Sequence, residues 1–153
     1  MDSKTRTLER PEIEALIPHR PPFLFVDRVL ELEGDAIVTE WRAPEDAAFF
    51  QGHYPGNPIT PGVLLSEFAV QSAAILVGAT EAGERPDGAV PVLTHIQNAR
   101  FRRMVRPGDT VRTRATVVER VGDARFVHAR IESATGETTA RLEFTVVLAR
   151  EES

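Results

Sequence analysis

The sequence contains no cysteine, which excludes a disulfide framework, thiol catalysis and any thiolate metal site. No apolar run reaches the roughly 20 residues of a membrane span, and residues 1–6 lead into no apolar segment. We therefore expect no membrane helix and no secretory signal. Basic charge is also not in excess, because 18 basic residues face 23 acidic ones for a formal net charge of −5. This balance argues against a nucleic-acid-binding protein.

Lysine is almost absent as well, since Lys4 is the single lysine and 17 of the 18 basic residues are arginine. The chain has 153 residues, 42% of them hydrophobic, which fits one domain with a real core. We predict a single domain over residues 1–153, with residues 1–10 polar and frayed. The lack of cysteine fits a reducing compartment, and we expect a cytoplasmic protein.

One segment has the pattern of a helix that is buried on every side. Residues 63–77 are apolar almost all the way round, Thr60 is a suitable N-cap for them, and Gly78 is a suitable stop. A short helix is predicted over residues 11–17. Elsewhere, apolar and alternating runs between short turns predict strands. These runs are residues 23–32, 36–42, 90–98, 111–117, 125–133 and 138–148.

The sequence thus predicts an α+β domain in which five to six antiparallel strands wrap around one long buried helix. Such a small sheet leaves edges and one flank of the helix open, and pairing with a second copy would cover both. We therefore expect a homodimer.

The segment 43–62 is rich in glycine and proline and predicts a long ordered loop, a feature that is often functional. It holds His53, which is a natural general base if the loop keeps its imidazole neutral. Fourteen positions later, Glu67 lies in the buried helix, where loss of water would favour its protonated form, and Gln71 lies one turn further on. A structural histidine and an ordinary solvated or ion-paired carboxylate are the alternative interpretations.

Gly62 stands at the start of the buried helix, where an unpaired N–H and the positive end of the helix dipole would stabilise an enolate oxygen. A glycine needed only for close packing is the alternative interpretation. A base, an oxyanion donor and an acid together fit removal of a proton next to a carbonyl, followed by loss of a hydroxyl. No nucleophile elbow and no metal-ligand spacing is present. We assign His19, His95 and His128 to structural or surface roles.

Three blocks of sequence carry a resemblance to a known family. Residues 17–28 read IPHRPPFLFVDR, residues 49–67 read FFQGHYPGNPITPGVLLSE, and residues 98–109 read NARFRRMVRPGD. In order and spacing they resemble the FabZ-like branch of the 3-hydroxyacyl-(acyl-carrier-protein) dehydratases, which have the hotdog fold. The resemblance implies dehydration of a 3-hydroxyacyl thioester to the trans-2-enoyl thioester in fatty-acid synthesis or a related lipid or polyketide route.

The resemblance also implies roles for individual residues. The catalytic histidine falls on His53, the catalytic acid on Glu67, the oxyanion amide on Gly62, and the carbonyl that orients the histidine on Ile59. It implies no metal and no cofactor beyond the phosphopantetheine arm of the substrate. It further implies active sites shared across a homodimer, with a trimer of dimers as a common assembly. A glutamate at the acid position argues for dehydration without double-bond migration.

The chain departs from the family pattern at a few positions. The family usually has methionine where Thr60 stands, tyrosine at Pro21 and proline at Met104. The segment 66–70 differs from the common small-residue version, and Phe68 and Val70 are expected to reshape the acyl tunnel. We count Phe68, with Gln71, among the substrate-binding residues. These departures leave the acyl chain length and the pathway open.

The expected partner is acyl-carrier protein, which is acidic. The densest basic cluster, Arg100, Arg102, Arg103 and Arg106, is the predicted docking surface, although a solvated strand face is the alternative. Three other functions stay open at this point: a hotdog thioesterase, a non-catalytic hotdog partner subunit, and a hydratase acting on coenzyme A thioesters.

Overall fold

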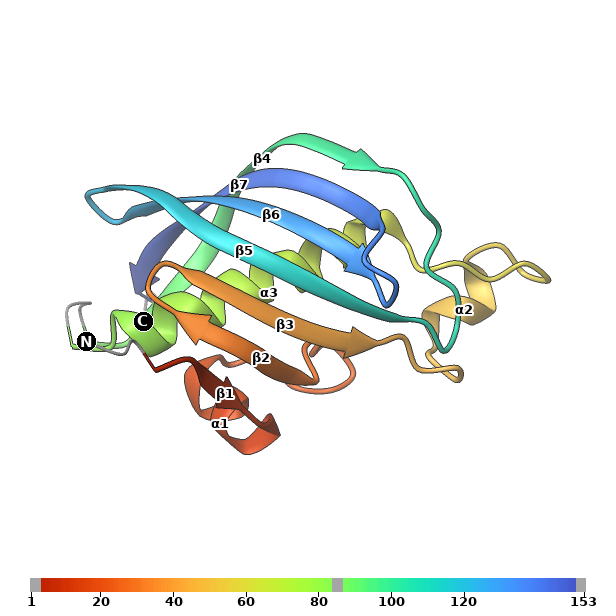
Figure 1. The fold of residues 1–153 in the computed structure, drawn as a ribbon, viewed down its shortest axis with the longest axis horizontal. Coiled ribbons are helices and arrows are strands. Elements are labelled where there is room, and N and C mark those ends of the chain that lie inside the picture. The colour runs from red at the N-terminus through yellow and green to blue at the C-terminus, as the bar shows by residue number, and fades with distance from the viewer. Residues whose placement is uncertain (1–3, 84–86, 151–153) are drawn as a thin grey trace.

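A computed structural model describes residues 4–83 and 87–150 as a curved antiparallel sheet around one long helix, α3 (Gly62–Thr80) (Figure 1). The strands are β1 (Arg6–Leu8), β2 (Arg28–Glu33), β3 (Ala36–Arg42), β4 (Ala89–Phe101), β5 (Thr110–Val121), β6 (Ala124–Ser133) and β7 (Thr138–Arg150). They are ordered β1-β2-β3-β5-β6-β7-β4 in a single seven-stranded sheet. Two short helices, α1 (Arg10–Leu16) and α2 (Phe49–Gly52), complete the domain. The α+β hotdog architecture predicted from the sequence is confirmed.

Helix α3 forms the centre of the core. Every residue from Phe68 to Gly78 is buried, as the all-round apolar pattern predicts. The prediction is wrong for the start of the helix, where Val63 is 76% exposed and Leu64 and Glu67 are only partly buried. By length and composition alone α3 is apolar enough to span a membrane, and 72% of that stretch is buried inside the domain, as in the core helix of a soluble protein. The predicted stop at Gly78 is wrong, because the helix continues to Thr80. A Cβ on Gly78 would lie 3.1 Å from the Leu16 carbonyl oxygen, so glycine there lets α1 approach closely.

The sheet has one strand more than the five to six predicted. The extra strand, β1, pairs with β2 and falls in the segment that we expected to be frayed. Its Leu8 is 2% exposed and belongs to the core, which explains why these residues are ordered. Residues 1–3 of that segment lie outside the described residues.

The predicted strand over residues 23–32 is also partly wrong. Only β2 is a strand, and residues 23–27 run as an irregular segment beside α3. Its backbone forms a hydrogen bond with a buried side chain instead, since the Phe25 N–H donates to Gln71 Oε1 at 2.8 Å.

The predicted N-cap of α3 is also wrong. The N-cap is Pro61, which makes no side-chain hydrogen bond, and Thr60 precedes it. The Thr60 N–H donates to the Val105 carbonyl at 2.7 Å, which keeps its backbone in the loop.

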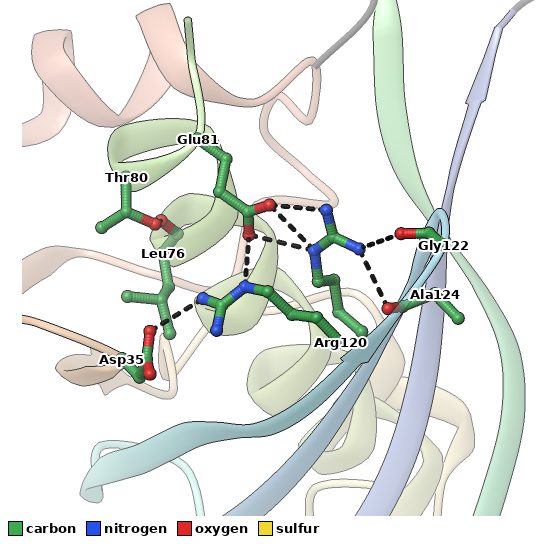
Figure 2. A network of polar contacts seen from close by, with 8 residues as sticks. Asp35, Leu76, Thr80, Glu81, Arg120, Gly122 and Ala124 are labelled. Atoms are coloured by element: carbon green, nitrogen blue, oxygen red, sulfur yellow. Dashed lines mark hydrogen bonds and ion pairs between the residues drawn. The ribbon is translucent and has the colours of Figure 1, made fainter. Parts of the chain in front are cut away.

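A buried ion pair holds the far end of α3 to the sheet (Figure 2). Glu81, the C-cap of α3, accepts from Arg125 of β6, with Oε1 to Nη2 at 2.7 Å and both side chains about nine-tenths buried or more. Arg120 of β5 bridges Glu81 at 3.6 Å and Asp35 at 2.8 Å. The hydrogen bond to Asp35 raises the pKa of the Arg120 guanidinium above its ordinary value, against the opposing effect of burial. This network fixes α3 from the end opposite to the candidate site.

Candidate active site

His53 caps the C-terminal end of α2, and its imidazole is held by the loop that follows. The His53 N–H donates to the Phe49 carbonyl at 3.0 Å, and Nδ1 lies 2.8 Å from the Ile59 carbonyl oxygen. A carbonyl oxygen only accepts, so Nδ1 must carry a proton. In the neutral ring Nε2 then keeps its lone pair, which is the tautomer that a general base needs. The contact with Ile59 that the family resemblance implies is therefore present.

Glu67 lies on α3 and is tied to the helix one turn further along. Its Oε1 accepts from Gln71 Nε2 at 3.0 Å, and its side chain is 21% exposed. Gln71 is fully buried and is itself fixed, because Nε2 also donates to the Phe23 carbonyl at 3.0 Å while Oε1 accepts from the Phe25 N–H. The predicted Glu67–Gln71 hydrogen bond is confirmed. Glu67 is thus a half-buried carboxyl in a fixed orientation.

His19 is the residue of this site that the sequence analysis missed. Its Nε2 lies 3.5 Å from Glu67 Oε1, and its Nδ1 is buried without a hydrogen-bond partner among the described residues. The segment around it is rigid, because the Arg20 guanidinium donates to the carbonyls of Glu14, Ile17 and His19 at 2.7–2.8 Å. The prolines on either side of His19 and Arg20 were the available signal, since they mark a fixed segment of extended chain.

Gly62 occupies the first position of α3 and its N–H makes no hydrogen bond with any residue that the structure describes. The first-turn N–H groups and the helix dipole together favour a negatively charged oxygen there. The ring of Phe101, at the end of β4, lies over this position. A Cβ built on Gly62 would be 3.3 Å from two of its ring carbons, so glycine keeps the space between backbone and ring open.

His53 and Glu67 are not joined by a hydrogen bond or ion pair within the described part of one chain. Phe68, which we counted among the substrate-binding residues, is 0% exposed and packs against Trp41 with ring centroids 6.1 Å apart. Its contact with a substrate stays a prediction. An apolar cavity of about 600 Å³ lies between α2, β3 and the segment that holds Phe23 and Phe25, and His53, Gly62 and Glu67 are not among its lining residues. Leu64 of α3 and Trp41 also line it.

The basic cluster predicted from the sequence is divided by the structure. Arg103 pairs with Glu137 at 2.7 Å, and Arg106 donates to Asn57 Oδ1 at 2.7 Å. Arg100 and Arg102 instead line a groove of about 610 Å³ on the outer face of the sheet. Across residues 4–83 and 87–150, no group of three or more histidine, aspartate or glutamate side chains is placed to hold a metal ion.

Comparison with known sequences shows which protein family the chain resembles. A family model of FabA-like domains matches residues 17–141. The chain is 38% identical over 141 residues to the 3-hydroxyacyl-(acyl-carrier-protein) dehydratase FabZ of Anaeromyxobacter sp. (strain K), covering 92% of this chain and 90% of that protein. It is 51% identical over 102 residues to the FabZ of Chloroflexus aggregans, covering 66% and 69% of the two chains.

Solved structures share the fold at lower identity. The dehydratase heterocomplex ApeI:P from Xenorhabdus doucetiae aligns with a TM-score of 0.77 at 13% identity, covering 91% of both chains. The PaaI protein from the phenylacetic acid degradation operon of E. coli aligns with a TM-score of 0.62 at 15% identity, covering 78% of this chain and 80% of that one. At these identities the likeness is one of fold alone.

Proposed function

The chain belongs to the FabA-like domain family, and from that membership we propose that it is a 3-hydroxyacyl-(acyl-carrier-protein) dehydratase of the FabZ type. It is a hydro-lyase that removes water from a 3-hydroxyacyl thioester and leaves the trans-2-enoyl thioester in fatty-acid synthesis. The observation that carries this conclusion is the 38% identity to a FabZ over 92% of the chain. The geometry around His53 and Gly62 supports the same chemistry.

His53 is the proposed base. With its Nδ1 proton held by the Ile59 carbonyl, Nε2 takes the proton from the carbon next to the thioester carbonyl. The electron pair of that C–H bond moves into the carbonyl, whose oxygen gains negative charge. The free Gly62 N–H at the start of α3 stabilises this oxygen.

Glu67 is the proposed acid. Its carboxyl gives a proton to the 3-hydroxyl group, the C–O bond breaks, and water leaves as the enolate collapses to the enoyl thioester. Gln71 fixes the orientation of the carboxyl by its hydrogen bond to Oε1. The next turnover requires that the proton held by His53 and the one lost by Glu67 be exchanged with solvent.

A homodimer brings the two halves of this site together. Among the described residues of one chain no hydrogen bond or ion pair joins His53 to Glu67, and in the proposed dimer the His53 of one copy acts together with the Glu67 of the other. Strand β4 supports this arrangement, because it is a 13-residue sheet edge with exposed Val92, Leu93 and Ile96. Such an edge pairs readily with the same edge of a second copy. A trimer of dimers is the larger assembly that we propose.

The substrate arrives on the phosphopantetheine arm of acyl-carrier protein, and no other cofactor takes part. The apolar cavity beside Leu64 and Trp41 suits an acyl chain. Docking of the acidic carrier involves the predicted basic cluster, which consists of Arg100, Arg102, Arg103 and Arg106.

The enzyme is a soluble protein that works in the cytoplasm. The two FabZ relatives are dehydratases by name, whereas two structures titled as thioesterases are 14% and 23% identical to this chain, a likeness of fold alone.

Turnover of a short 3-hydroxyacyl thioester tests the function directly. Enoyl formation is followed by absorbance and free thiol by a thiol reagent, with the His53→Ala variant as control. Enoyl product without thiol, lost in the variant, is the expected result. Thiol release without enoyl product would make the protein a thioesterase, and neither product would make it a non-catalytic subunit. Faster turnover of the coenzyme A thioester than of the carrier-bound one would make it a coenzyme A hydratase.

A further inference from the structure

Four arginines form a continuous row across four neighbouring strands. In the register of the sheet, Arg100 of β4 stands opposite Arg141 of β7, Arg141 stands opposite Arg130 of β6, and Arg130 stands opposite Arg114 of β5. We call these four residues the arginine row. All three pairings place like charges directly opposite each other in adjacent strands, an arrangement that lowers the stability of a sheet.

The arginine row lies on the face of the sheet that points away from α3. The residues next to it in sequence, Ala115, Ala129 and Leu142, are buried on the other face. In Figure 1, α3 passes behind β5, β6 and β7, and none of the described helices covers their outer face. The row is therefore open to a partner.

The carboxylates around the row do not balance its charge. Arg130 has Glu132 at 3.3 Å, and Arg114 has only an exposed Glu31 at 4.0 Å. Arg100 and Arg141 have no carboxylate within ion-pair distance among the residues that the structure describes. Glu143, the one acid lining the groove, already accepts from Asn98 at 2.8 Å and Gln97 at 3.2 Å.

This positive surface belongs to a protein whose formal net charge is −5, so the excess of arginine is local. Arg102 lines the same groove of about 610 Å³ and adds to the positive surface. Guanidinium groups pair with carboxylates through two parallel hydrogen bonds, which favours an acidic partner.

The spacing of the row fits an acidic helix. Adjacent strands are roughly 4.8 Å apart, so the row spans about 15 Å. One turn of an α-helix advances about 5.4 Å, so carboxylates one turn apart on a helix laid across the strands would meet successive arginines. An open row of arginines about 15 Å long is better suited to binding a protein surface than to binding a small anion.

The row also ends next to the candidate site. Arg100 is followed by Phe101, whose ring lies against Gly62 at the start of α3. A partner bound along the row therefore has one end beside the position proposed for the thioester oxygen. A flexible arm attached to that partner would have a short path around the end of β4.

We propose that the arginine row is the surface on which an acidic helix of the carrier protein docks while its acyl arm enters the active site. This inference rests on the proposed function, because it assumes a substrate that arrives on a carrier. It moves the centre of docking from Arg103 and Arg106, which have partners of their own, to Arg114, Arg130 and Arg141.

The test compares the double variant Arg130→Gln/Arg141→Gln with the control Arg112→Gln. Arg112 lies on the same face of β5, but its Nε is paired with Glu40 at 3.0 Å and it stands outside the row. Each protein is assayed with the same 3-hydroxyacyl group on carrier protein and on free pantetheine. Loss of two contacts should raise KM for the carrier-bound substrate about tenfold or more, with kcat/KM for the pantetheine thioester unchanged.

Binding of fluorescent holo-carrier protein to the inactive His53→Ala protein gives a readout that does not depend on turnover. Affinity should fall when Arg130 and Arg141 are also replaced, and it should fall with added salt more steeply in the parent than in the triple variant. An equal change in Arg112→Gln, or no change in either variant, would overturn the proposal. So would tighter binding of a single-stranded oligonucleotide than of the carrier, or dissociation of the oligomer in the double variant on a sizing column.

The failure of the proposed function is distinguishable from the failure of this inference. If the parent protein dehydrates neither thioester, the function is wrong. If it dehydrates both and the row variants bind carrier normally, only the docking surface is wrong.

Discussion

His53 Nδ1 lies 2.8 Å from the carbonyl oxygen of Ile59, and this contact decides which ring nitrogen can act as a base. Because the carbonyl can only accept, Nε2 is left with the lone pair. Replacing His53 by alanine should lower kcat by a factor of about 10²–10⁴ on a pantetheine thioester, the usual contribution of a general base. The fold should persist, since the side chain is only half-buried.

The matched control for this variant is His128→Ala. His128 is exposed on β6, 3.5 Å from Glu143, and has no proposed part in the chemistry of a carrier-free substrate. Steady-state kinetics and circular dichroism of the two variants check the prediction. Equal loss of activity in both, or wild-type turnover by His53→Ala, would remove His53 from the mechanism.

Glu67→Gln tests the proposed acid without removing its shape. The amide oxygen of the new side chain can still accept from Gln71 Nε2, so the local structure should persist while the ionisable proton is lost. We expect kcat to fall by a factor of about 10²–10⁴ and the melting temperature to stay within a few degrees of the parent value. Glu119→Gln, an exposed glutamate on β5, is the control and should keep full activity.

His19 provides a test of how Glu67 is positioned. If the 3.5 Å approach of Nε2 to Glu67 Oε1 helps to fix the carboxyl, His19→Ala should lower kcat about tenfold with little change in KM, because only the orientation of the acid is affected. His19→Gln, which keeps a donor at similar reach, should recover part of the loss. Parallel changes in kcat and stability, with no recovery by glutamine, would assign His19 a purely structural role.

The sequence predicted the parts of this site that depend on local pattern. The all-round apolar helix marks Gln71 as a buried polar residue, and the glycines and prolines around His53 mark its ordered loop. The same pattern overstates the burial of Glu67, whose side chain is 21% exposed. The prediction missed the approach of His19 to Glu67, which spans 48 positions and depends on the path of an irregular segment beside α3. The prolines there indicate a rigid chain, but they do not indicate its direction.

The arginine row could not be predicted from the sequence either, because it depends on how the strands pair. Alternation predicts that Arg112 and Arg114 share the outer face of β5, but it does not align them with residues of other strands. The register contains shifts between Val117 and Glu119 and between Gln97 and Arg100. A shift of one residue exchanges the two faces of a strand, so the row emerges only from the paired structure. Strand β1 was missed for a related reason, since three residues become a strand only through pairing with β2.

Gly62 can be tested through its neighbour. A methyl group at this position would lie 3.3 Å from the ring of Phe101, closer than ordinary van der Waals contact, so the ring or the helix start must move. Gly62→Ala should lower kcat about tenfold or more, because displacement of the proposed oxyanion donor weakens stabilisation of the enolate.

The double variant Gly62→Ala/Phe101→Leu separates crowding from other effects. Leucine is smaller than phenylalanine and exposed at this place, so it should relieve the contact and restore part of kcat. The two single variants and the double variant form a cycle whose coupling is read from kcat/KM. Strict additivity would show that the alanine methyl group acts in some way other than contact with Phe101.

The ion pair of Glu81 with Arg125 (Figure 2) should contribute to stability rather than activity, because Glu81 is the C-cap of α3 whereas Gly62 is its first residue. Glu81→Leu leaves the Arg125 guanidinium buried beside two carbonyls, those of Gly122 and Ala124, which satisfy its Nη1 but not its charge. Removing one partner of a buried pair typically costs about 3–5 kcal/mol, so we expect a loss of unfolding free energy near the lower end of that range.

In the double variant Glu81→Leu/Arg125→Leu no charge of this pair stays buried, so urea denaturation should find the double variant more stable than Glu81→Leu. A double variant less stable than Glu81→Leu would mean that Arg125 stabilises the β5–β6 turn mainly through its carbonyl contacts and owes little to the carboxylate.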